Sequence, residues 1–482
     1  MIQMGIASLF GHQKRAIERA VSQRRLLIVR PFGSGKTLIG LCVADQLLSH
    51  QARYGLWVGP AHLLSQVKDE ARDWGLTLTI CRVSDTPASF QPGLHLASYN
   101  RLRLSREIFL SRQWDFVIVD EVHRAKNPST WNYQLLAKLR RQAPWFVGLT
   151  GSPFQNGPYE FFQIVSLFTG SRIIRRLEEC LEYKRKKPLT FWEFLWWKLF
   201  NRRPNRGPVV GIRNPDGIKQ LLQPYIDFAD GEEIARECHI PSVDEQVVSV
   251  QLEATELDQY RRLAGQIRKK ALRQFLTDDL DDSETASSFA RLSELRQFLL
   301  SFEGNPSSKT RQLCNDVANA AKDPSARILV FSNFLDRGVR VIAECLRTLS
   351  VPHLTYTGQI SHRQKSRQIR SFSEGLKRVL ILSPVGFEGL NLNNTTHIFI
   401  ADPHFNPEVT RQLVARATRA KSSVSKVTVY HYIAVSDKLA TGTVDQAVRR
   451  IAERKNQVNN ELRHILSDLS FDNCSSARIV EA

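Results

Sequence analysis

The chain contains 482 residues, and its 67 lysines and arginines against 48 acidic residues give a formal net charge of +19. Such an excess is not typical of a neutral metabolic enzyme and indicates a polyanionic partner, either nucleic acid or an anionic membrane surface. The membrane alternative is disfavoured, because no apolar run approaches the roughly 20 residues that cross a bilayer.

The amino-terminal segment and the cysteines both indicate an intracellular protein. Residues 1–8 contain no basic stretch followed by an apolar one, so the segment does not resemble a secretion signal. The seven cysteines are scattered and include no Cys-x-x-Cys pair, which argues against a disulfide framework and against a structural zinc site. We therefore expect reduced thiols that are mostly buried.

Short apolar runs alternate with helical patterns in the first 155 residues. Continuous apolar runs of this length are typical of strands that are buried on both faces of a parallel sheet. The same alternation returns toward the other end, whereas the middle of the chain is richer in charge and in helical periodicity. The runs occupy residues 26–30, 55–59, 116–120 and 146–150 in the first part, and 327–332, 378–383, 397–402 and 427–432 in the second.

These patterns predict an α/β protein with two parallel-sheet lobes and a mainly helical insertion between them. We place the first lobe at residues 1–155, the helical insertion and linker at 156–310, and the second lobe at 311–482. The insertion contains a basic and aromatic stretch at 184–206, for which three interpretations stay open. It forms a protrusion that engages DNA, an amphipathic helix packed on the first lobe, or a helix on a membrane surface.

A phosphate-binding loop is predicted where the apolar run at 26–30 meets a helix. The segment that follows reads Pro-Phe-Gly-Ser-Gly-Lys-Thr, and its glycines allow backbone N–H groups to turn toward phosphate oxygens. Lys36 would reach the β- and γ-phosphates of ATP, and the Thr37 hydroxyl would ligate Mg²⁺. Arg30 stands where the full motif has glycine, so the match is partial. The residues predicted to bind the nucleotide here are Gly33, Ser34, Gly35, Lys36 and Thr37.

Two carboxylates directly follow the apolar run at 116–119. Asp120 and Glu121 therefore lie at the carboxyl end of a predicted buried strand. Phosphoryl transfer needs mainly positioning and charge neutralisation, so one acid for the metal and one for water suffice. We expect Asp120 to hold Mg²⁺ and Glu121 to polarise the water that attacks the γ-phosphate.

Further segments occur in the order found in one family of motor proteins. Residues 149–156 read Leu-Thr-Gly-Ser-Pro-Phe-Gln-Asn, residues 383–392 read Ser-Pro-Val-Gly-Phe-Glu-Gly-Leu-Asn-Leu, and residues 412–419 read Gln-Leu-Val-Ala-Arg-Ala-Thr-Arg. With the phosphate-binding loop, they make the chain resemble the superfamily-two helicases, and within these the Swi/Snf-like DNA-translocating ATPases. The resemblance implies two RecA-like lobes, ATP and Mg²⁺ as cofactors, and double-stranded DNA as the nucleic-acid partner.

The resemblance also assigns catalytic roles to individual residues. Arg416 and Arg419 correspond to arginine fingers; they share one face of a helix, from which both guanidinium groups can reach γ-phosphate oxygens across a cleft. Gln13 would read adenine, and Gly389 would contribute to the nucleotide site. The catalytic residues implied in this way are Lys36, Asp120, Glu121, Arg416 and Arg419.

Contacts to nucleic acid and coupling between the two sites are implied by the same resemblance. The nucleic-acid candidates are Ser98, Tyr99, Thr357, Ser383 and Asn391. The coupling candidates are Thr150, Ser152 and Gln412, with His123 as a fourth. For His123 two interpretations stay open, because a single histidine after two acids is equally well a packed core residue.

Three functions are compatible with the sequence. The first is a double-stranded DNA translocase that remodels DNA or protein–DNA complexes, which residues 149–156 favour. The second is a strand-separating DNA or RNA helicase. The third is a hydrolysis-dead scaffold that binds nucleic acid under the control of ATP, against which Lys36 and Glu121 argue. Because no accessory reader domain is visible, we expect a minimal motor of the bacterial or viral type, cytoplasmic rather than nuclear.

Overall fold

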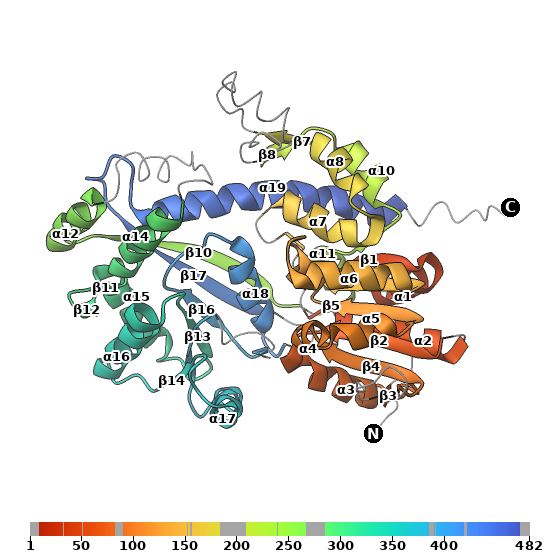
Figure 1. Ribbon diagram of the computed structural model, residues 1–482. Helices are drawn as coiled ribbons and strands as arrows, with labels where there is room; N and C mark the ends of the chain where they lie inside the picture. Colours follow the sequence, from red (N-terminus) through yellow and green to blue (C-terminus); the bar gives the residue numbers. More distant parts are fainter. Residues whose placement is uncertain are drawn as a thin grey trace, which may run out of the picture. The chain divides into compact units, whose positions relative to one another are not determined.

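The chain forms two compact units in the computed structural model (Figure 1). The first unit comprises residues 1–238 and 456–482, and the second comprises residues 239–455. The structure describes residues 9–31, 33–50, 52–81, 90–151, 153–154, 157–183, 209–238, 240–266, 285–384, 390, 392–418 and 422–472.

A seven-stranded sheet forms the centre of the first unit, in the order β3-β4-β2-β5-β6-β1-β9. All neighbouring strands in it are parallel. The first lobe was therefore predicted correctly as a parallel α/β sheet. Its strands are β1 (Arg25–Val29), β2 (Tyr54–Gly59), β3 (Ile80–Cys81), β4 (Gly93–Ser98), β5 (Phe116–Asp120), β6 (Trp145–Thr150) and β9 (Ile226–Phe228).

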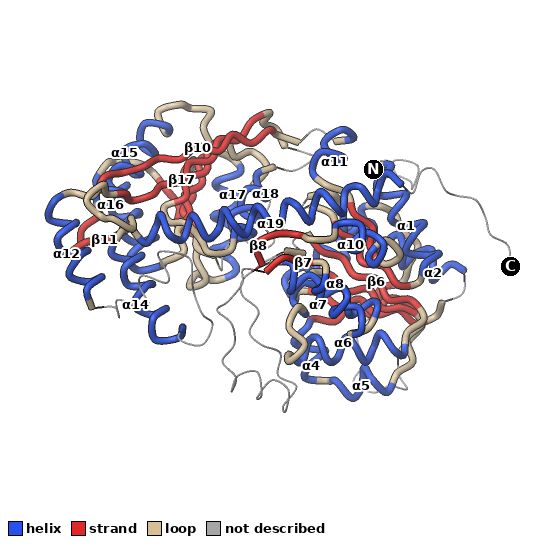
Figure 2. Tube along the Cα trace, turned by 90° about the horizontal axis from the view of Figure 1, so that it is seen from above, coloured by secondary structure: helices blue, strands red, loops and turns tan. Residues whose placement is uncertain are grey.

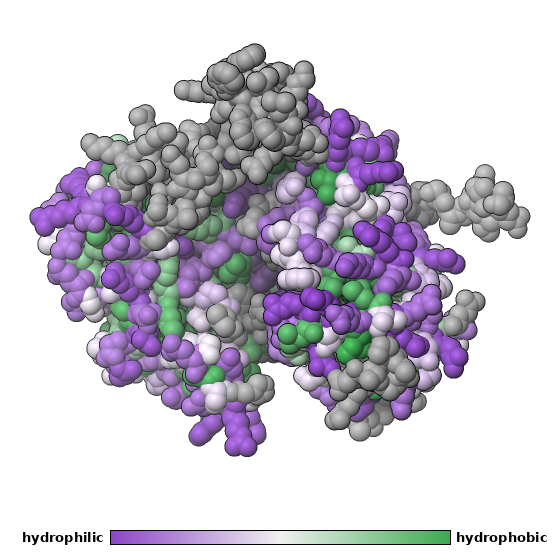
Figure 3. Space-filling model, viewed as in Figure 1, coloured by the Kyte–Doolittle hydropathy of each residue, from purple (hydrophilic) through white to green (hydrophobic). Residues whose placement is uncertain are grey.

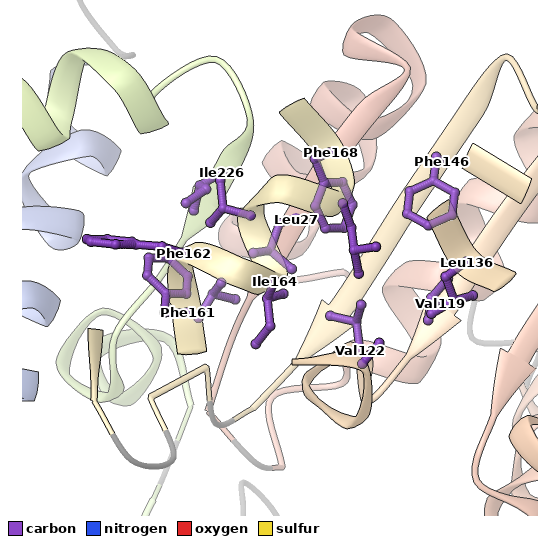
Figure 4. Close-up of a cluster of buried hydrophobic side chains, with 14 of the residues drawn as sticks. Leu27, Val119, Val122, Leu136, Phe146, Phe161, Phe162, Ile164, Phe168 and Ile226 are labelled. Carbon is purple, nitrogen blue, oxygen red and sulfur yellow. The ribbon is translucent and has the colours of Figure 1, made fainter. Parts of the chain in front are cut away.

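Helices cover both faces of this sheet, so its inner strands contribute to two hydrophobic cores. Along β1, Leu26 and Ile28 pack on the side of α1 (Gly11–Gln23) and α2 (Lys36–His50). The alternate residues, Leu27 and Val29, face α6 and α7 on the other side (Figure 4). This two-sided burial explains why the strand reads as a continuous apolar run. The other helices of the unit's first 238 residues are α3 (Leu64–Asp73), α4 (Tyr99–Leu104), α5 (Arg106–Ser111), α6 (Trp131–Gln142), α7 (Pro158–Thr169), α8 (Arg172–Glu179), α10 (Pro215–Leu222) and α11 (Gly231–Glu237).

The second unit also contains a parallel sheet, with six strands in the order β10-β17-β16-β13-β15-β14. Figure 2 shows the pair β10 and β17 side by side. Its strands are β10 (Ser242–Gln251), β13 (Ile328–Phe331), β14 (His353–Tyr356), β15 (Val379–Leu382), β16 (His397–Ile400) and β17 (Lys426–Val435). Its helices are α12 (Ala254–Gly265), α14 (Thr285–Phe298), α15 (Ser308–Ala320), α16 (Val341–Thr348), α17 (His362–Ser373) and α18 (Pro407–Ala417). The predicted fold class, two parallel-sheet lobes, is confirmed.

Two small hairpins complete the described strands. In the first unit β7 (Leu181–Tyr183) pairs with β8 (Val209–Ile212), and in the second β11 (Ser301–Phe302) pairs with β12 (Asn305–Pro306). The segment at 156–310 is divided between the two units, since the first continues to Cys238 and the second begins at His239. Among the described residues, none of the helices has the length and apolar character that crossing a bilayer demands.

One long helix, α19 (Val444–Asp472), contributes to both units. Up to Lys455 it belongs to the second unit, and from Asn456 onward it belongs to the first. Its later part runs close to α10 (Figures 1 and 2). This part buries four side chains in a core of the first unit, and its Asp468 pairs with Lys219 of α10 at 2.6 Å. The four buried side chains are Leu462, Ile465, Leu466 and Leu469.

Candidate active site

The predicted phosphate-binding loop joins the end of β1 to the start of α2. Gly33 and Gly35 have φ angles of 81° and 80°, a left-handed conformation that side chains rarely adopt. At Gly35 the space is also closed, because an added Cβ would lie 2.5 Å from Nε2 of Gln13. The loop therefore needs glycine at both positions, and it leads into the amino-terminal end of α2, the end of a helix that favours an anion.

Lys36 lies at the first turn of α2 with its ammonium group turned into this loop. Nζ donates hydrogen bonds to the carbonyl oxygens of Arg30 at 3.2 Å and Pro31 at 2.9 Å. The side chain is buried, so the charged ammonium group lies within the loop and is largely shielded from solvent. Thr37, the predicted Mg²⁺ ligand, is the next residue of the same turn and is half-buried.

Gln13 of α1 is fixed against the phosphate-binding loop. Its Nε2 donates to the carbonyl oxygen of Ser34 at 3.1 Å, and its Oε1 accepts from the backbone N–H of Phe10 at 3.1 Å. The neighbouring His12 is also fixed, because its Nδ1 lies 2.8 Å from Oε2 of Glu237. The residue predicted to read adenine is thus held next to the loop predicted to bind phosphates.

Asp120, the last residue of β5, is a buried carboxylate that interacts electrostatically with the ammonium group of Lys36. Burial raises the pKa of Asp120 to about 7, Glu121 adds to the rise, and Lys36 opposes it. This electrostatic interaction means that the phosphate-binding loop and the two acids share one site. A divalent cation would neutralise a carboxylate that is otherwise costly to ionise, so these residues fit the Mg²⁺ that the sequence predicted.

Glu121 has a left-handed backbone, with φ 49° and ψ 49°. Three hydrogen bonds support this strained residue. The Tyr99 hydroxyl donates to the carbonyl oxygens of Asp120 at 2.8 Å and Glu121 at 3.1 Å, and the Glu121 N–H donates to Oδ1 of Asp120 at 2.9 Å. Tyr99, expected to contact nucleic acid, is buried with its hydroxyl directed at the backbone of the two acids.

His123 connects Glu121 to the end of β6. Its Nδ1 lies 3.2 Å from Oε2 of Glu121 and 3.2 Å from Oγ1 of Thr150. Both His123 and Thr150 are buried. The structure thus places His123 in the core and at the same time against the predicted catalytic acid, so the two interpretations of this residue do not exclude each other.

A buried ion pair that the sequence did not reveal lies at the start of the loop. Arg30 occupies the position where the motif has glycine, and its guanidinium group hydrogen-bonds to Oδ1 and to the carbonyl oxygen of Asp227 on β9. Both side chains are fully buried. Burial alone would raise the pKa of Asp227, but Arg30, Arg15 and Arg19 outweigh it and lower that pKa below its usual value. The only sequence signal for this pair was the charged residue at a glycine position.

The predicted contacts in the second unit lie at the carboxyl ends of neighbouring strands. Thr357 follows β14 and Ser383 follows β15; both are buried, and the Ser383 N–H donates to the carbonyl oxygen of Tyr356 at 3.4 Å. In the first unit, Ser98 ends β4 and its Oγ accepts the Arg101 N–H at 3.1 Å, which caps α4.

Gln412 and Arg416 lie one turn apart on α18. This helix begins at Pro407, and the Oδ1 of Asn406 caps it by accepting the Glu408 N–H at 2.9 Å. Four predicted site residues, Ser152, Gly389, Asn391 and Arg419, lie outside the described residues, as does the stretch 184–206.

Comparison with known families agrees with this arrangement. The SNF2-related domain matches residues 12–301, which is more than half of the chain, and the helicase conserved C-terminal domain matches residues 308–421. The chain belongs to the SNF2-related family. The family resemblance read from the motifs is therefore confirmed, and this SNF2-related protein is a helicase-like, ATP-hydrolysing enzyme.

The SNF2-related chain is also similar to individual proteins along most of its length. A protein of Acanthamoeba polyphaga mimivirus, whose name calls it an ATP-dependent RNA helicase (L538), is 22% identical over 96% of this chain and 98% of its own. The Bacillus subtilis protein YqhH, named as an ATP-dependent helicase, is 24% identical over 85% of this chain and 72% of its own. The solved SWI2/SNF2 ATPase core of Sulfolobus solfataricus with double-stranded DNA is 16% identical, with a TM-score of 0.40 over 97% of this chain and 95% of that one.

Proposed function

We propose that this SNF2-related ATPase is a motor that moves along double-stranded DNA and uses ATP hydrolysis to remodel DNA or protein–DNA complexes. The observation that carries the proposal is the single site formed by Lys36, Asp120 and Glu121, in which the lysine lowers the cost of charging the neighbouring aspartate. The net charge of +19 supports a polyanionic partner.

Each group of this site would have a separate task. Backbone N–H groups of the loop at 33–36 and the ammonium group of Lys36 would bind the phosphates of ATP. Thr37 and Asp120 would hold Mg²⁺, which when bound supplies charge neutralisation at the phosphates. Glu121 would orient the attacking water and accept its proton, while His123 fixes the Glu121 carboxylate from Nδ1.

The second unit would supply the arginine fingers. Arg416 and Arg419 are proposed for this role because planar guanidinium groups suit the oxygens of the γ-phosphate. Thr150, Ser152, His123 and Gln412 are proposed to couple the nucleotide site to the nucleic-acid site.

The decisive experiment measures phosphate release with duplex DNA, forked DNA, single-stranded DNA and RNA. We expect stimulation by duplex DNA in the wild type, and release at background level for Lys36→Ala and Glu121→Gln, with duplex binding retained in both variants. Tyr159→Ala, a half-exposed aromatic on α7, serves as a matched control with unchanged release. Wild-type turnover in either site variant would show that the active site lies elsewhere, and absence of release with every nucleic acid would favour the scaffold alternative.

A strand-separating helicase is the second candidate. It is supported by the similarity, over nearly the full length of both chains, to the mimivirus protein named as an RNA helicase. A fluorescent duplex with a single-stranded overhang distinguishes the two candidates. Strand separation that accompanies ATP hydrolysis would favour the helicase. ATP hydrolysis without strand separation would favour the translocase.

A further inference from the structure

An exposed tryptophan marks a surface of the first unit that the nucleotide site does not use. Trp131, the first residue of α6, is 52% exposed, although large aromatic side chains are usually well buried. The Arg106 guanidinium group lies 5.2 Å from the centre of its ring. This contact orients the indole while leaving about half of the residue open to solvent.

The tryptophan lies close to the carboxyl edge of the sheet. Thr130 caps α6 by accepting the Tyr133 N–H on Oγ1, and only residues 121–130 separate α6 from the end of β5. The helices α4 and α5, which follow directly after β4, pack against α6. Open parallel sheets bind their ligands at this edge. The indole therefore stands on the same edge as the nucleotide site, but near β4 rather than β1.

Basic residues predominate in the helices that pack against α6. The segment of α4 and α5 contains Arg101, Arg103 and Arg106 against a single acid, Glu107. Burial raises the pKa of Tyr99 and the charge of Arg124 opposes that shift, so Arg124 also lies near the start of α4. On the face shown in Figure 3, hydrophilic and hydrophobic side chains lie side by side over the region of α4.

An exposed aromatic ring that is oriented by one arginine, with further arginines nearby in the chain, is suited to bind an unpaired nucleotide. Bases offer a flat π face that stacks on an aromatic side chain, and the flanking phosphates are neutralised by arginines. An intact duplex keeps its bases stacked on each other, so an indole engages a base only where the strands have separated. The combination thus selects a base outside the duplex rather than the duplex itself.

We propose that Trp131 and Arg106 form a stacking platform for an unpaired base of nucleic acid, with Arg101 and Arg103 contacting the adjacent phosphates. The proposal rests on the nucleic-acid-dependent function argued above and adds a preference for forks or single-stranded segments. It assigns a ligand to a part of α4–α6 that none of the sequence motifs covers.

Fluorescence anisotropy with forked, single-stranded and blunt duplex DNA tests the platform across a range of salt concentrations. We expect Trp131→Ala to weaken binding of forked and single-stranded DNA about tenfold, to change blunt-duplex binding less than about twofold, and to leave the salt dependence unaltered. Trp131→Phe keeps a ring and should retain most of the affinity. Arg103→Gln should instead reduce the slope of log affinity against log salt by about one for all three DNAs, since it removes a phosphate contact.

The control is Tyr159→Ala, which removes an aromatic side chain of similar exposure, 50%, from α7. It should bind all three DNAs as the wild type does. The platform is refuted if Trp131→Ala binds forked DNA normally, or if it weakens all three DNAs equally. These results are distinct from a failure of the proposed function, which would appear as wild-type protein whose phosphate release duplex DNA does not stimulate.

Discussion

Replacing Asp120, the buried carboxylate proposed to hold Mg²⁺, is expected to stabilise the protein in the absence of ligand while it abolishes activity. Burial and Glu121 raise the pKa of Asp120 from 3.8 to about 7, so the ionised side chain is much less favourable in the folded state than in the unfolded one. A difference of about 3 pKa units at about 1.4 kcal/mol each sets a ceiling of about 4 kcal/mol. Asp120→Asn keeps the Oδ1 acceptor for the Glu121 N–H and removes the charge. After local relaxation we expect a gain of about 1–3 kcal/mol at pH 8.

The sign of the pH dependence follows from the same shift. Because the folded state of the wild type binds this proton more tightly than the unfolded state, its stability falls as the pH rises from about 4 to about 7 and is level above that. The asparagine variant does not titrate at this position. The advantage of Asp120→Asn should therefore be largest at pH 8 and small at pH 4, which is close to the unfolded-state pKa of 3.8 and leaves little of the ionisation penalty.

Urea denaturation of wild type and variant at pH 8, 6 and 4, without nucleotide or metal, measures these differences. Glu121→Gln removes the adjacent charge that helps to raise the pKa of Asp120, so it should give a smaller gain of the same sign. Adding Mg²⁺ and a non-hydrolysable ATP analogue should stabilise the wild type more than Asp120→Asn, because only the aspartate offers a charged ligand. A variant that is less stable than the wild type at pH 8 would refute the reasoning, since it would mean that the ionised carboxylate is already well compensated.

Two further substitutions test contacts that support the site. Asp227→Ala should destabilise the protein by about 3–5 kcal/mol in urea denaturation, because it leaves Arg30 buried without its carboxylate. The control Glu233→Ala removes a partly exposed partner of Arg15 and should cost less than about 1 kcal/mol. Equal losses of stability in the two variants would contradict the assigned burial. Leu466→Ala should lower the free energy of unfolding by about 2–5 kcal/mol in the same assay, because this side chain of α19 is fully buried in a core of the first unit. A decrease below about 1 kcal/mol would show that the packing there is loose.

The parallel sheets could be predicted from the sequence because burial on both faces leaves a local signature. Each central strand is a run of consecutive apolar residues, and β1 shows why: Leu26 and Leu27 enter different cores on opposite faces. The tight loop before α2 was equally predictable, since the left-handed backbone at Gly33 and Gly35 requires glycine, and its binding of phosphate stays a prediction. Such features depend on residues that are adjacent in the chain, so they can be predicted from a short stretch of sequence.

Other features depend on partners that are distant in sequence, and no local pattern announces them. Arg30 and Asp227 are 197 residues apart and meet only because β9 pairs with β1. The later part of α19 packs in the first unit although it follows the second along the chain. The role of Tyr99 toward nucleic acid stays a prediction from the family resemblance, and no pattern around it indicated the hydrogen bonds that its hydroxyl donates to the backbone of Asp120 and Glu121.

Two groups of the candidate site carry charges that the proposed ligand would compensate. Burial makes Asp120 costly to ionise, and the buried ammonium group of Lys36 lies in the loop that is predicted to bind phosphates. A bound Mg²⁺·ATP would give Asp120 its cation and Lys36 its anion at the same time. The folded protein bears the cost of these buried charges, and a ligand that compensates them binds only the folded state. We therefore expect nucleotide binding to stabilise the first unit.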